Sequence, residues 1–429
     1  MKYTPIDQAL YINNRKNFVK HLKPHSVAIF NSNDIMPTNA DGTMPFRQNN
    51  DLLYLSGIDQ EESVLVIAPN ASNPKHREVL FVKETSELIA IWEGEKLTKD
   101  AATQQSGIQS VYWLSDFENV LHNLIVEAET IYLNQNEHLR AITTVETRDD
   151  RFRKQCKAKY PDHHYERLAP IMRKLRPIKS QPEIDVMQQA CNITEKGFRR
   201  VLEFVKAGVM EYEIEAEFMH EFLRNRSKGF AYEPIIASGY NACVLHYVQN
   251  NMECKAGDVI LLDVGAEYAN YASDMTRCIP VSGTFTPRQK EVYNAVLRVM
   301  KAATGMLTPG TKHNEYHEEV GKIMESELIG LGLLDKHDVA NQDPKNPLYK
   351  KYFMHGTSHH LGLDVHDVEE RDRTFEAGMV LTVEPGIYIR EESLGIRLEN
   401  DIVITGNGQF DLMANIPLEA EEIEDLMNK

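Results

Sequence analysis

Residues 259–281, VILLDVGAEYANYASDMTRCIPV, carry the pattern that decides the fold of the second half of the chain. An apolar run of strand type leads to Asp263, and Asp274 follows 11 residues later in a second strand-like run. A hairpin centred between Tyr268 and Ala269 would place these two carboxylates directly opposite each other. The stretch therefore predicts an antiparallel hairpin that holds an acidic pair in largely apolar surroundings.

The acidic pair needs compensation, because buried carboxylates without a partner are costly. A divalent metal bound by Asp263 and Asp274 is one solution, and a salt bridge to Arg277 is the other. Gly265 would also permit an earlier turn, so the spacing allows the two carboxylates to meet without requiring it. From these residues alone, both interpretations stay open.

Four histidines lie close together in HGTSHHLGLDVHD, residues 355–367; they are His355, His359, His360 and His366. The glycines in this stretch let the backbone approach a ligand closely. The stretch therefore indicates a ligand-binding loop, and a polar loop with solvated imidazoles is the alternative interpretation.

Two further carboxylates end or occupy apolar strands. Glu384 follows MVLTV, and in IRLENDIVI the side chains of Arg397 and Glu399 share one strand face. Taken alone, Arg397 could simply be the partner of Glu399. Taken together, four carboxylates and one imidazole can bind two divalent ions, and a ligand set rich in oxygen suits Mn²⁺, Co²⁺ or Zn²⁺. Two such ions share a water, lower its pKa and polarise a carbonyl, which is hydrolase chemistry.

The chain divides into two predicted domains, residues 1–175 and 176–429. In the first, short apolar runs alternate with helical patterns, which favours an α/β domain; its predicted strands are 26–31, 52–58, 62–68, 78–84 and 130–134. The second mixes helices with strands of antiparallel type, an α+β pattern. Its predicted helices are 183–208, 212–229, 287–306 and 313–331, and its predicted strands are 259–265, 271–281, 379–385 and 396–405.

Composition excludes some partners. With 47 basic and 64 acidic residues the net charge is −17, which argues against a protein that binds nucleic acid or an anionic membrane. The five cysteines are scattered and form no CxxC, which is typical of a reducing compartment. The start has no apolar core of a signal peptide, so we expect a cytoplasmic protein.

The motif order LLDVGAEY, SDMTR, HGTSHHLGLDVHD, TVEPGIY and IRLEND resembles that of the pita-bread metallopeptidases, and within them aminopeptidase P and prolidase. MPFRQNNDLLYLSGI and IWEGEKL resemble the amino-terminal domain of the proline-specific members. The resemblance implies a ribonuclease-H-like first domain, a pita-bread second domain with pseudo-twofold symmetry, and a homodimer or homotetramer. Trp92 would then reach the site of a neighbouring subunit.

The resemblance also assigns the metal ligands residue by residue. It implies that Asp263 chelates one ion, that Asp274 and Glu399 bridge both, and that His359 and Glu384 hold the other. Mn²⁺ is the expected metal, with Co²⁺ or Zn²⁺ as alternatives. Glu384 would also be the general base.

Further residues match substrate-side positions of the family. His355 and His366 would bind the substrate carbonyl and assist proton transfer, and His246 would be another substrate-side histidine. Arg397 would orient the substrate or the bridging glutamate, and Tyr388 is a weaker candidate.

The resemblance implies a Xaa-Pro aminopeptidase, which uses a metal-bridging hydroxide to cleave between an N-terminal residue and a following proline. The alternative is a Xaa-Pro dipeptidase, which needs a cation for the free carboxylate of its substrate. Arg371 is the candidate cation, but the short segment between Asp367 and Glu376 favours the aminopeptidase. A non-catalytic pita-bread module or a creatinase-like hydrolase is disfavoured, because all five metal ligands are present.

Two other histidine positions are assigned to roles outside the chemistry. His313 and His317 stand at i and i+4 of a predicted helix, but the sequence is not HExxH, so we expect a solvated helix face. His360, next to the predicted ligand His359, is expected to pack or to line the pocket wall.

Overall fold

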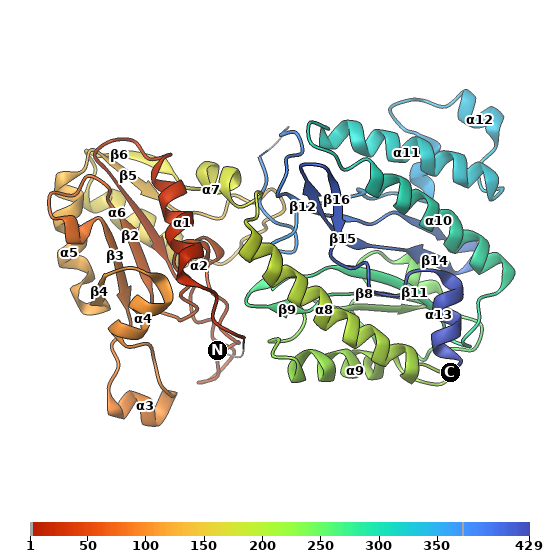
Figure 1. Ribbon diagram of the computed structural model, residues 1–429, viewed down its shortest axis with the longest axis horizontal. Helices are drawn as coiled ribbons and strands as arrows, with labels where there is room; N and C mark the ends of the chain where they lie inside the picture. Colours follow the sequence, from red (N-terminus) through yellow and green to blue (C-terminus); the bar gives the residue numbers. More distant parts are fainter. Residues whose placement is uncertain (1–2, 371–372) are drawn as a thin grey trace. The chain divides into compact units, whose positions relative to one another are not determined.

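The computed structural model describes residues 3–370 and 373–429 (Figure 1). By their internal contacts these residues form two units, Pro5–Arg176 and Pro177–Lys429, and the second unit also includes Tyr3 and Thr4. The two units are referred to below as the amino-terminal and the carboxy-terminal unit.

The amino-terminal unit is built on one sheet with the strand order β4-β3-β2-β1-β5-β6. Its strands are β1 (Ser26–Asn31), β2 (Val64–Ile67), β3 (Glu78–Val82), β4 (Ser110–Trp113), β5 (Thr130–Leu133) and β6 (His164–Arg167). Strands β1, β2 and β3 pair antiparallel, whereas β5 pairs parallel with both β1 and β6. Its helices are α1 (Gln8–Val19), α2 (Asn50–Ser56), α3 (Glu87–Glu93), α4 (Lys99–Ser106), α5 (Phe117–Glu127), α6 (Arg148–Lys159) and α7 (Ala169–Leu175), with short 3₁₀ turns η1 (Pro74–His76) and η2 (Leu114–Asp116).

One predicted strand of this unit is wrong. LLYLSGI, residues 52–58, lies mostly in helix α2, because Asn49 caps the helix and Gly57 ends it in the left-handed conformation with φ 71°. Every residue from Leu52 to Ser56 is buried. A helix buried on all sides shows no 3.6-residue periodicity, so the short apolar run resembles a buried strand.

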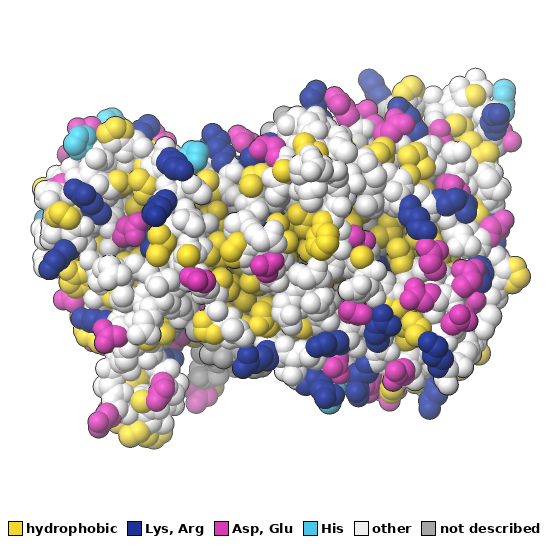
Figure 2. Space-filling model, in the orientation of Figure 1, with side chains coloured by type: hydrophobic (Ala, Val, Ile, Leu, Met, Phe, Trp, Pro, Cys, Tyr) yellow, Lys and Arg dark blue, Asp and Glu magenta, His cyan; other side chains and the backbone are white. Residues whose placement is uncertain are grey.

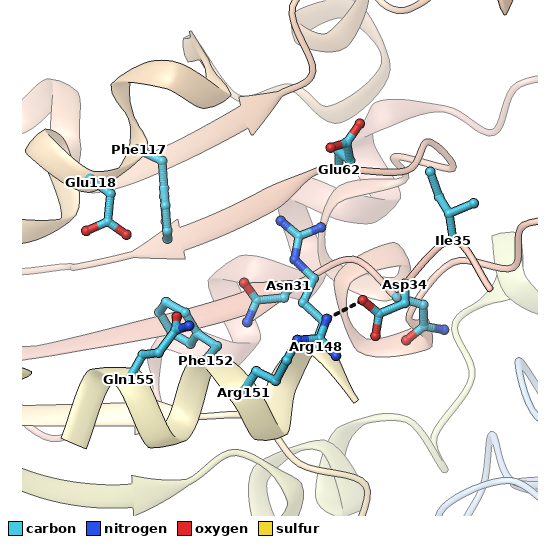
Figure 3. Close-up of a pocket in the computed structure, with 11 residues that line it drawn as sticks. Asn31, Asp34, Ile35, Glu62, Phe117, Glu118, Arg148, Arg151, Phe152 and Gln155 are labelled. Carbon is cyan, nitrogen blue, oxygen red and sulfur yellow. Dashed lines mark hydrogen bonds and ion pairs between the residues drawn. The ribbon is translucent and has the colours of Figure 1, made fainter. Parts of the chain in front are cut away.

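The amino-terminal unit contains a polar cavity of about 460 Å³ beside the end of β1 (Figure 3). Arg151 pairs there with Asp34, and Arg148 Nη1 donates to Ser32 Oγ at 2.7 Å. Carboxylates of Glu62 and Glu118 also line the cavity, so its positive charges are balanced by acidic groups. None of the predicted site residues lies there.

The carboxy-terminal unit contains the long helices. They are α8 (Gln181–Phe204), α9 (Glu211–Arg224), α10 (Pro287–Gly305) and α11 (His313–Gly330), with the shorter α12 (Lys336–Ala340) and α13 (Ala420–Met427). Its strands are β7 (Ile235–Ser238), β8 (Val259–Val264), β9 (Glu267–Tyr268), β10 (Tyr271–Ala272), β11 (Met275–Pro280), β12 (Val380–Val383), β13 (Gly386–Ile389), β14 (Leu394–Arg397), β15 (Asn400–Thr405) and β16 (Gly408–Asp411). Short 3₁₀ turns are η3 (Gly239–Cys243), η4 (Leu348–Lys351) and η5 (Arg390–Glu392).

The same set of elements occurs twice in this unit. Strands β11, β8 and β7 form one three-stranded sheet, and β12, β15 and β16 form another. Figure 1 shows α8 and α9 along one side of these strands and α10 and α11 along the other. Helix α9 contacts β7, and α10 contacts β12 and β16; the buried residues of these helices include Phe218 of α9 and Val296 of α10. The strands are therefore covered on both sides, and their ends meet inside the unit.

The hairpin that decides the fold forms in a different register from the one expected. Strands β8 and β11 pair Asp263 with Thr276, so the predicted direct pairing of Asp263 with Asp274 is wrong. The cause is the turn, in which Ala269 and Asn270 both adopt positive φ, of 52° and 68°. Positive φ at both central residues is the geometry of a two-residue type I′ turn, and it moves the centre of the hairpin by one residue.

The two acidic side chains nevertheless share one face of the hairpin. Residues two positions apart on a strand point to the same side, so Asp274 lies diagonally from Asp263. Gly265 makes this possible, because a Cβ atom at that position would lie 1.8 Å from the carbonyl oxygen of Ser273.

On the face of the molecule seen in Figure 2, acidic and basic side chains are interspersed. Among the described residues, no helix combines the length and apolarity needed to cross a bilayer.

We predict that Gly265→Ala destabilises the hairpin by about 1–3 kcal/mol, because the added methyl group meets backbone that cannot rotate away. Urea unfolding of the whole chain measures the change. Gly305→Ala is the control, since a Cβ atom there has no neighbour within 4 Å. Alanine is a better helix former than glycine, so the control is expected to be neutral or stabilising by up to about 1 kcal/mol. Equal stability of the two variants would contradict the prediction.

Candidate metal centre

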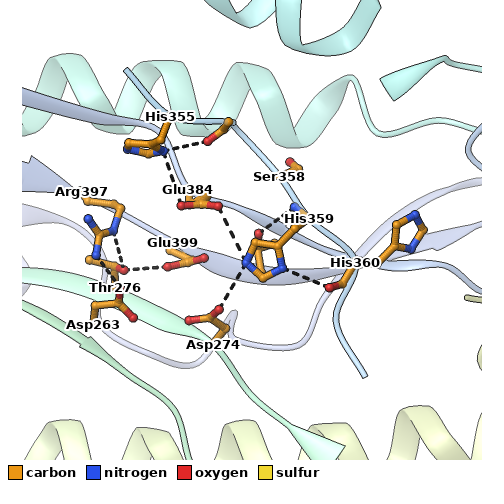
Figure 4. A network of polar contacts seen from close by, with 12 residues as sticks. Asp263, Asp274, Thr276, His355, Ser358, His359, His360, Glu384, Arg397 and Glu399 are labelled. Atoms are coloured by element: carbon orange, nitrogen blue, oxygen red, sulfur yellow. Dashed lines mark hydrogen bonds and ion pairs between the residues drawn. The ribbon is translucent and has the colours of Figure 1, made fainter. Parts of the chain in front are cut away.

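The predicted ligands come together where the strands of the carboxy-terminal unit end (Figure 4). Asp263 lies near the end of β8, Asp274 directly precedes β11, and Glu384 directly follows β12. Glu399 lies between β14 and β15, so the predicted continuous strand 396–405 is in fact two strands with this residue in the gap. His359 comes from the loop before β12, which pairs with that strand through the bridge between His360 and Leu381.

One imidazole nitrogen faces the carboxylates. His359 Nε2 lies 3.4 Å from Asp274 Oδ2 and 3.8 Å from Glu384 Oε1. Ligand atoms of Asp274, His359 and Glu399 all lie within 4.8 Å of one another. On its other side, His359 Nδ1 contacts the carbonyl oxygen of His360 at 3.0 Å. A hydrogen bond from Nδ1 to that oxygen leaves Nε2 as the nitrogen that would bind a metal.

Asp263 joins the cluster through two neighbours. The hydroxyl of Tyr232 lies 2.6 Å from both Asp263 Oδ1 and Asp274 Oδ1, and Arg397 Nη2 donates to Asp263 Oδ2. The cation beside the acidic pair is therefore Arg397, and the alternative salt bridge to Arg277 is wrong. Arg277 donates instead to the carbonyl oxygens of Pro417 at 2.8 Å and of Glu399 at 2.7 Å.

Burial and crowding make the carboxylates weak acids in the absence of a cation. Burial raises the pKa of Glu384 to about 7, although His359 and Arg397 oppose the shift. Burial also raises the pKa of Asp263, and the charge of Asp274 adds to the effect. The pKa of Glu399 is raised well above its ordinary value by burial first and then by Asp274.

The same carboxylates raise the pKa of His359, against the effect of its burial. Burial lowers the pKa of His359, but its contact with Asp274 and the charge of Glu384 outweigh burial and raise the pKa to about 9. The cluster therefore has an excess of buried negative charge that attracts positive charge. Four carboxylates and one imidazole fit one or two divalent ions, and Asp263, Asp274, His359, Glu384 and Glu399 would hold them.

A chain of hydrogen bonds sets the protonation of His355. Arg397 Nη1 donates to the hydroxyl oxygen of Tyr388 at 2.9 Å, and that hydroxyl lies 2.8 Å from His355 Nε2. Burial and the charge of Arg397 lower the pKa of His355 to about 3, so the ring is neutral. Because Arg397 has no acceptor, Tyr388 donates to Nε2, and the proton of His355 is on Nδ1. Nδ1 lies 2.8 Å from the carbonyl oxygen of Gly356 and 3.6 Å from Glu384 Oε2.

The remaining predicted residues are placed as follows. The rings of His366 and His359 are nearly perpendicular, with centroids 4.4 Å apart. His246 is exposed after the turn η3, and its charge contributes to the low pKa of His355. Trp92 is 81% exposed on α3 of the amino-terminal unit. Arg371 lies outside the described residues.

Besides Tyr232, described above, two more polar residues at the centre were missed by the sequence analysis. Thr276 donates to Glu399 Oε2 at 2.6 Å and accepts from Arg397 Nε at 3.1 Å. Asp401 Oδ2 accepts from the backbone N–H of Asp274 at 3.0 Å. Thr276 is two residues after Asp274, and Asp401 is two residues after Glu399. This spacing, which places each on the strand face of a predicted ligand, was the signal in the sequence that could have identified them.

The expectation that His313 and His317 form a solvated helix face is wrong. His313 Nε2 lies 3.0 Å from the carbonyl oxygen of Ser358, and His317 Nδ1 lies 2.9 Å from Thr357 Oγ1. His360 packs as expected, since only 6% of it is exposed.

Comparison with known proteins gives two domain matches. The pattern of metallopeptidase family M24 matches residues 185–406, and that of the amino-terminal domain of aminopeptidase P matches residues 11–132. Xaa-Pro aminopeptidase of Escherichia coli (strain K12) is 37% identical over 427 residues, which cover 96% of either chain. Xaa-Pro aminopeptidase 3 of Homo sapiens is 32% identical over 412 residues, which cover 93% of this chain and 78% of the relative.

Solved structures of E. coli aminopeptidase P share the fold of the whole chain. Its low-pH form superimposes with a TM-score of 0.89, at 34% identity and with 99% of both chains covered. The zinc-substituted enzyme in complex with product gives a TM-score of 0.87, at 34% identity and the same coverage. A two-domain architecture with a carboxy-terminal pita-bread domain is therefore confirmed.

We predict that the metal-free protein loses stability as the pH rises through about 7. A carboxyl whose pKa is raised in the folded state stabilises that state below its ordinary value near 4.5, and the contribution disappears above the raised value near 7. The melting temperature of the metal-free protein should therefore fall between pH 5 and pH 8, and added Mn²⁺ should raise it more at pH 8 than at pH 6. Glu384→Gln removes the contribution of this carboxyl, so the melting temperature of that metal-free variant should fall less over the same interval. An equal metal-induced shift at both pH values would contradict the prediction.

Proposed function

The chain belongs to metallopeptidase family M24, in the branch that carries the aminopeptidase P amino-terminal domain, and from this premise we propose that it is a metal-dependent Xaa-Pro aminopeptidase. The reaction would hydrolyse the bond between an N-terminal residue and a following proline. The observation that carries the proposal is the cluster in which His359 Nε2 faces the carboxylates of Asp274 and Glu384. All five ligands that the resemblance implies lie at this one centre.

Asp263, Asp274, His359, Glu384 and Glu399 would hold the divalent ions. The ions, for which we propose Mn²⁺, would supply a water of lowered pKa and polarise the scissile carbonyl.

Side chains of the protein would carry out the proton transfers of the reaction. An X–Pro bond has no N–H, so its nitrogen must receive a proton when the C–N bond breaks. Glu384 is the proposed general base, which takes a proton from the attacking water and returns it to the proline nitrogen. His355 and His366 would bind the substrate carbonyl and assist proton transfer, and His246 would be another substrate-side histidine.

Arg397 orients several groups of the site at once. Its guanidinium binds Asp263, the hydroxyl oxygen of Tyr388 and Thr276 Oγ1. It therefore holds a metal ligand with one nitrogen and, through Tyr388, sets the tautomer of His355 with another. A lysine could not replace it, because only a planar fork of donors reaches these three acceptors at once.

The alternative is a Xaa-Pro dipeptidase. Both relatives described above are named Xaa-Pro aminopeptidase, which favours the aminopeptidase. The dipeptidase interpretation depends on a cation for the substrate carboxylate, and its candidate, Arg371, lies outside the described residues.

Several finer features are part of the proposal. The antiparallel strands β1, β2 and β3, beside the parallel β5 and β6, support a ribonuclease-H-like amino-terminal domain. We place the domains at residues 1–175 and 176–429. A cytoplasmic homodimer or homotetramer, with Trp92 at a contact between subunits, stays a prediction.

The experiment that tests the function compares a tripeptide, Xaa-Pro-Yaa, with the matching dipeptide, Xaa-Pro, after metal removal and reloading with Mn²⁺. We expect release of free Xaa from the tripeptide, with a much slower reaction on the dipeptide. Mass spectrometry of the products measures both. Cleavage of the dipeptide alone would establish the dipeptidase, and no cleavage of either peptide by Mn²⁺-loaded protein would contradict both functions.

We predict that Glu384→Gln lowers kcat by about 10²–10⁴-fold, because it removes the general base. Metal analysis should still find at least one bound ion, since the other four ligands remain. Glu391→Gln is the matched control: Glu391 is an exposed glutamate of η5, seven residues further along the chain, and its side chain is 66% exposed. If the two variants had similar rates, Glu384 would not be the base.

A further inference from the structure

The segment of residues 355–367, called the His-rich segment below, is held along one edge by β12. Backbone hydrogen bonds run from Glu384 N to Thr357 O at 2.8 Å, from Thr382 N to His359 O at 3.0 Å, and from Leu361 N to Val380 O at 3.1 Å. The start of this segment therefore lies beside β12 as an additional antiparallel strand. His355 lies just before the paired part, and His359 lies within it.

Along the outer edge of this added strand, Ser358 faces helix α11. Further along, His360 O accepts from Asp367 N and Gly362 O accepts from Ala272 N of β10, both at 2.8 Å. Alternate backbone groups of a strand point to opposite edges, so the carbonyl of Ser358 points away from β12. His313 Nε2 lies 3.0 Å from that carbonyl oxygen, and the hydroxyl of Tyr316 lies 3.1 Å from Ser358 Oγ. Only 7% of Ser358 is exposed, and a buried carbonyl without a donor is unfavourable.

His317, one helical turn after His313, contacts the segment at two points. Its Nδ1 lies 2.9 Å from Thr357 Oγ1, and Thr357 is almost fully buried. Its ring also meets Phe353 edge to face, with centroids 6.1 Å apart, and Phe353 contacts the ring of His355 at 5.0 Å. Residues at i and i+4 share a helix face, so His313 and His317 approach the same segment together.

We propose that His313 and His317 are positioning residues, which fix the outer edge of the His-rich segment and thereby hold His355 and His359 in register with the carboxylates. This inference rests on the proposed metallopeptidase function. Without the side chains of α11, the start of the strand at Ser358 would be hydrogen-bonded along one edge only and could shift or twist. A displacement of about 1 Å at a catalytic group can cost about 10²-fold in rate. Partners behind a metal ligand commonly contribute about 10–100-fold to metal affinity.

The contact pattern also separates this role from simple packing. Both imidazoles meet oxygen atoms of the segment at hydrogen-bonding distance, and His313 Nδ1 additionally lies 3.8 Å from Glu369 Oε2. The contact of Nε2 with the carbonyl oxygen of Ser358 orients the ring of His313. A side chain of equal size without the donor would fill the space and leave the backbone unrestrained.

The test therefore uses variants matched in size. His313→Gln keeps an amide where Nε2 was, and His313→Met removes it; His317→Asn keeps a polar atom where Nδ1 was, and His317→Leu removes it. His220→Leu is the control, because His220 is an exposed histidine on helix α9. Mn²⁺ affinity is measured by calorimetry on the full metal-stripped chain, and kcat and KM are measured on a Xaa-Pro-Yaa tripeptide.

We expect His313→Met and His317→Leu to weaken Mn²⁺ binding by about 10–100-fold and to lower kcat, with KM nearly unchanged. The Gln and Asn variants should bind Mn²⁺ and turn over close to wild type. In a Thr357→Val background, which removes the hydroxyl at similar volume, His317→Leu should cost little more. If the apolar variants match His220→Leu, or if each polar variant loses as much as its apolar pair, the proposal is overturned.

Two further outcomes are decided in the same experiment. If an apolar variant does not fold, Thr357→Val alone tests the contact of His317, and unchanged Mn²⁺ affinity in that variant would overturn the proposal for this residue. If wild-type protein binds Mn²⁺ but cleaves no Xaa-Pro peptide, the proposed function fails. The affinity differences within each matched pair then still decide whether the two histidines position the segment.

Discussion

The repulsion among four buried or largely buried carboxylates is the constraint on which the rest of this structure depends. Asp263, Asp274, Glu384 and Glu399 lie around a single imidazole, and burial raises the pKa of three of them. Such an arrangement stores unfavourable free energy in the folded chain unless positive charge enters. The protein meets this requirement partly with Arg397, and the remaining excess of negative charge is what makes the centre a strong site for divalent ions.

Most groups that contact the carboxylates orient them without neutralising their charge. Tyr232 and Thr276 contact them through neutral hydroxyls, which fix carboxylate orientation and add no charge. Arg397 is the exception, and it binds Asp263 at the edge of the cluster. The ligands are therefore oriented before a metal arrives, and binding need not reorganise them.

The duplicated architecture supplies the rigidity that such a site requires. Ligands from β8, β11, β12 and the gap between β14 and β15 converge because two three-stranded sheets end at the same place, with helices covering them. His359 comes from the His-rich segment, which lies beside β12 and outside the two three-stranded sheets. The start of this segment is held by β12 on one edge and by side chains of α11 on the other. In the proposed role, α11 therefore affects the position of His355 and His359 although it lies far from most of the metal ligands in sequence.

The sequence by itself determined the residue types of the site and most of the elements that carry them. Apolar runs that end in acidic residues marked Asp263 and Glu384, because strand periodicity and burial are local properties of the chain. Tertiary structure alone decided the register of the hairpin, since a turn with positive φ at Ala269 and Asn270 has no strong sequence signal without glycine. It also decided that Arg397, and not Arg277, lies beside Asp263, and that His313 and His317 face the His-rich segment. Contacts of this kind join residues distant along the chain, and no local pattern records which of several polar faces will be covered.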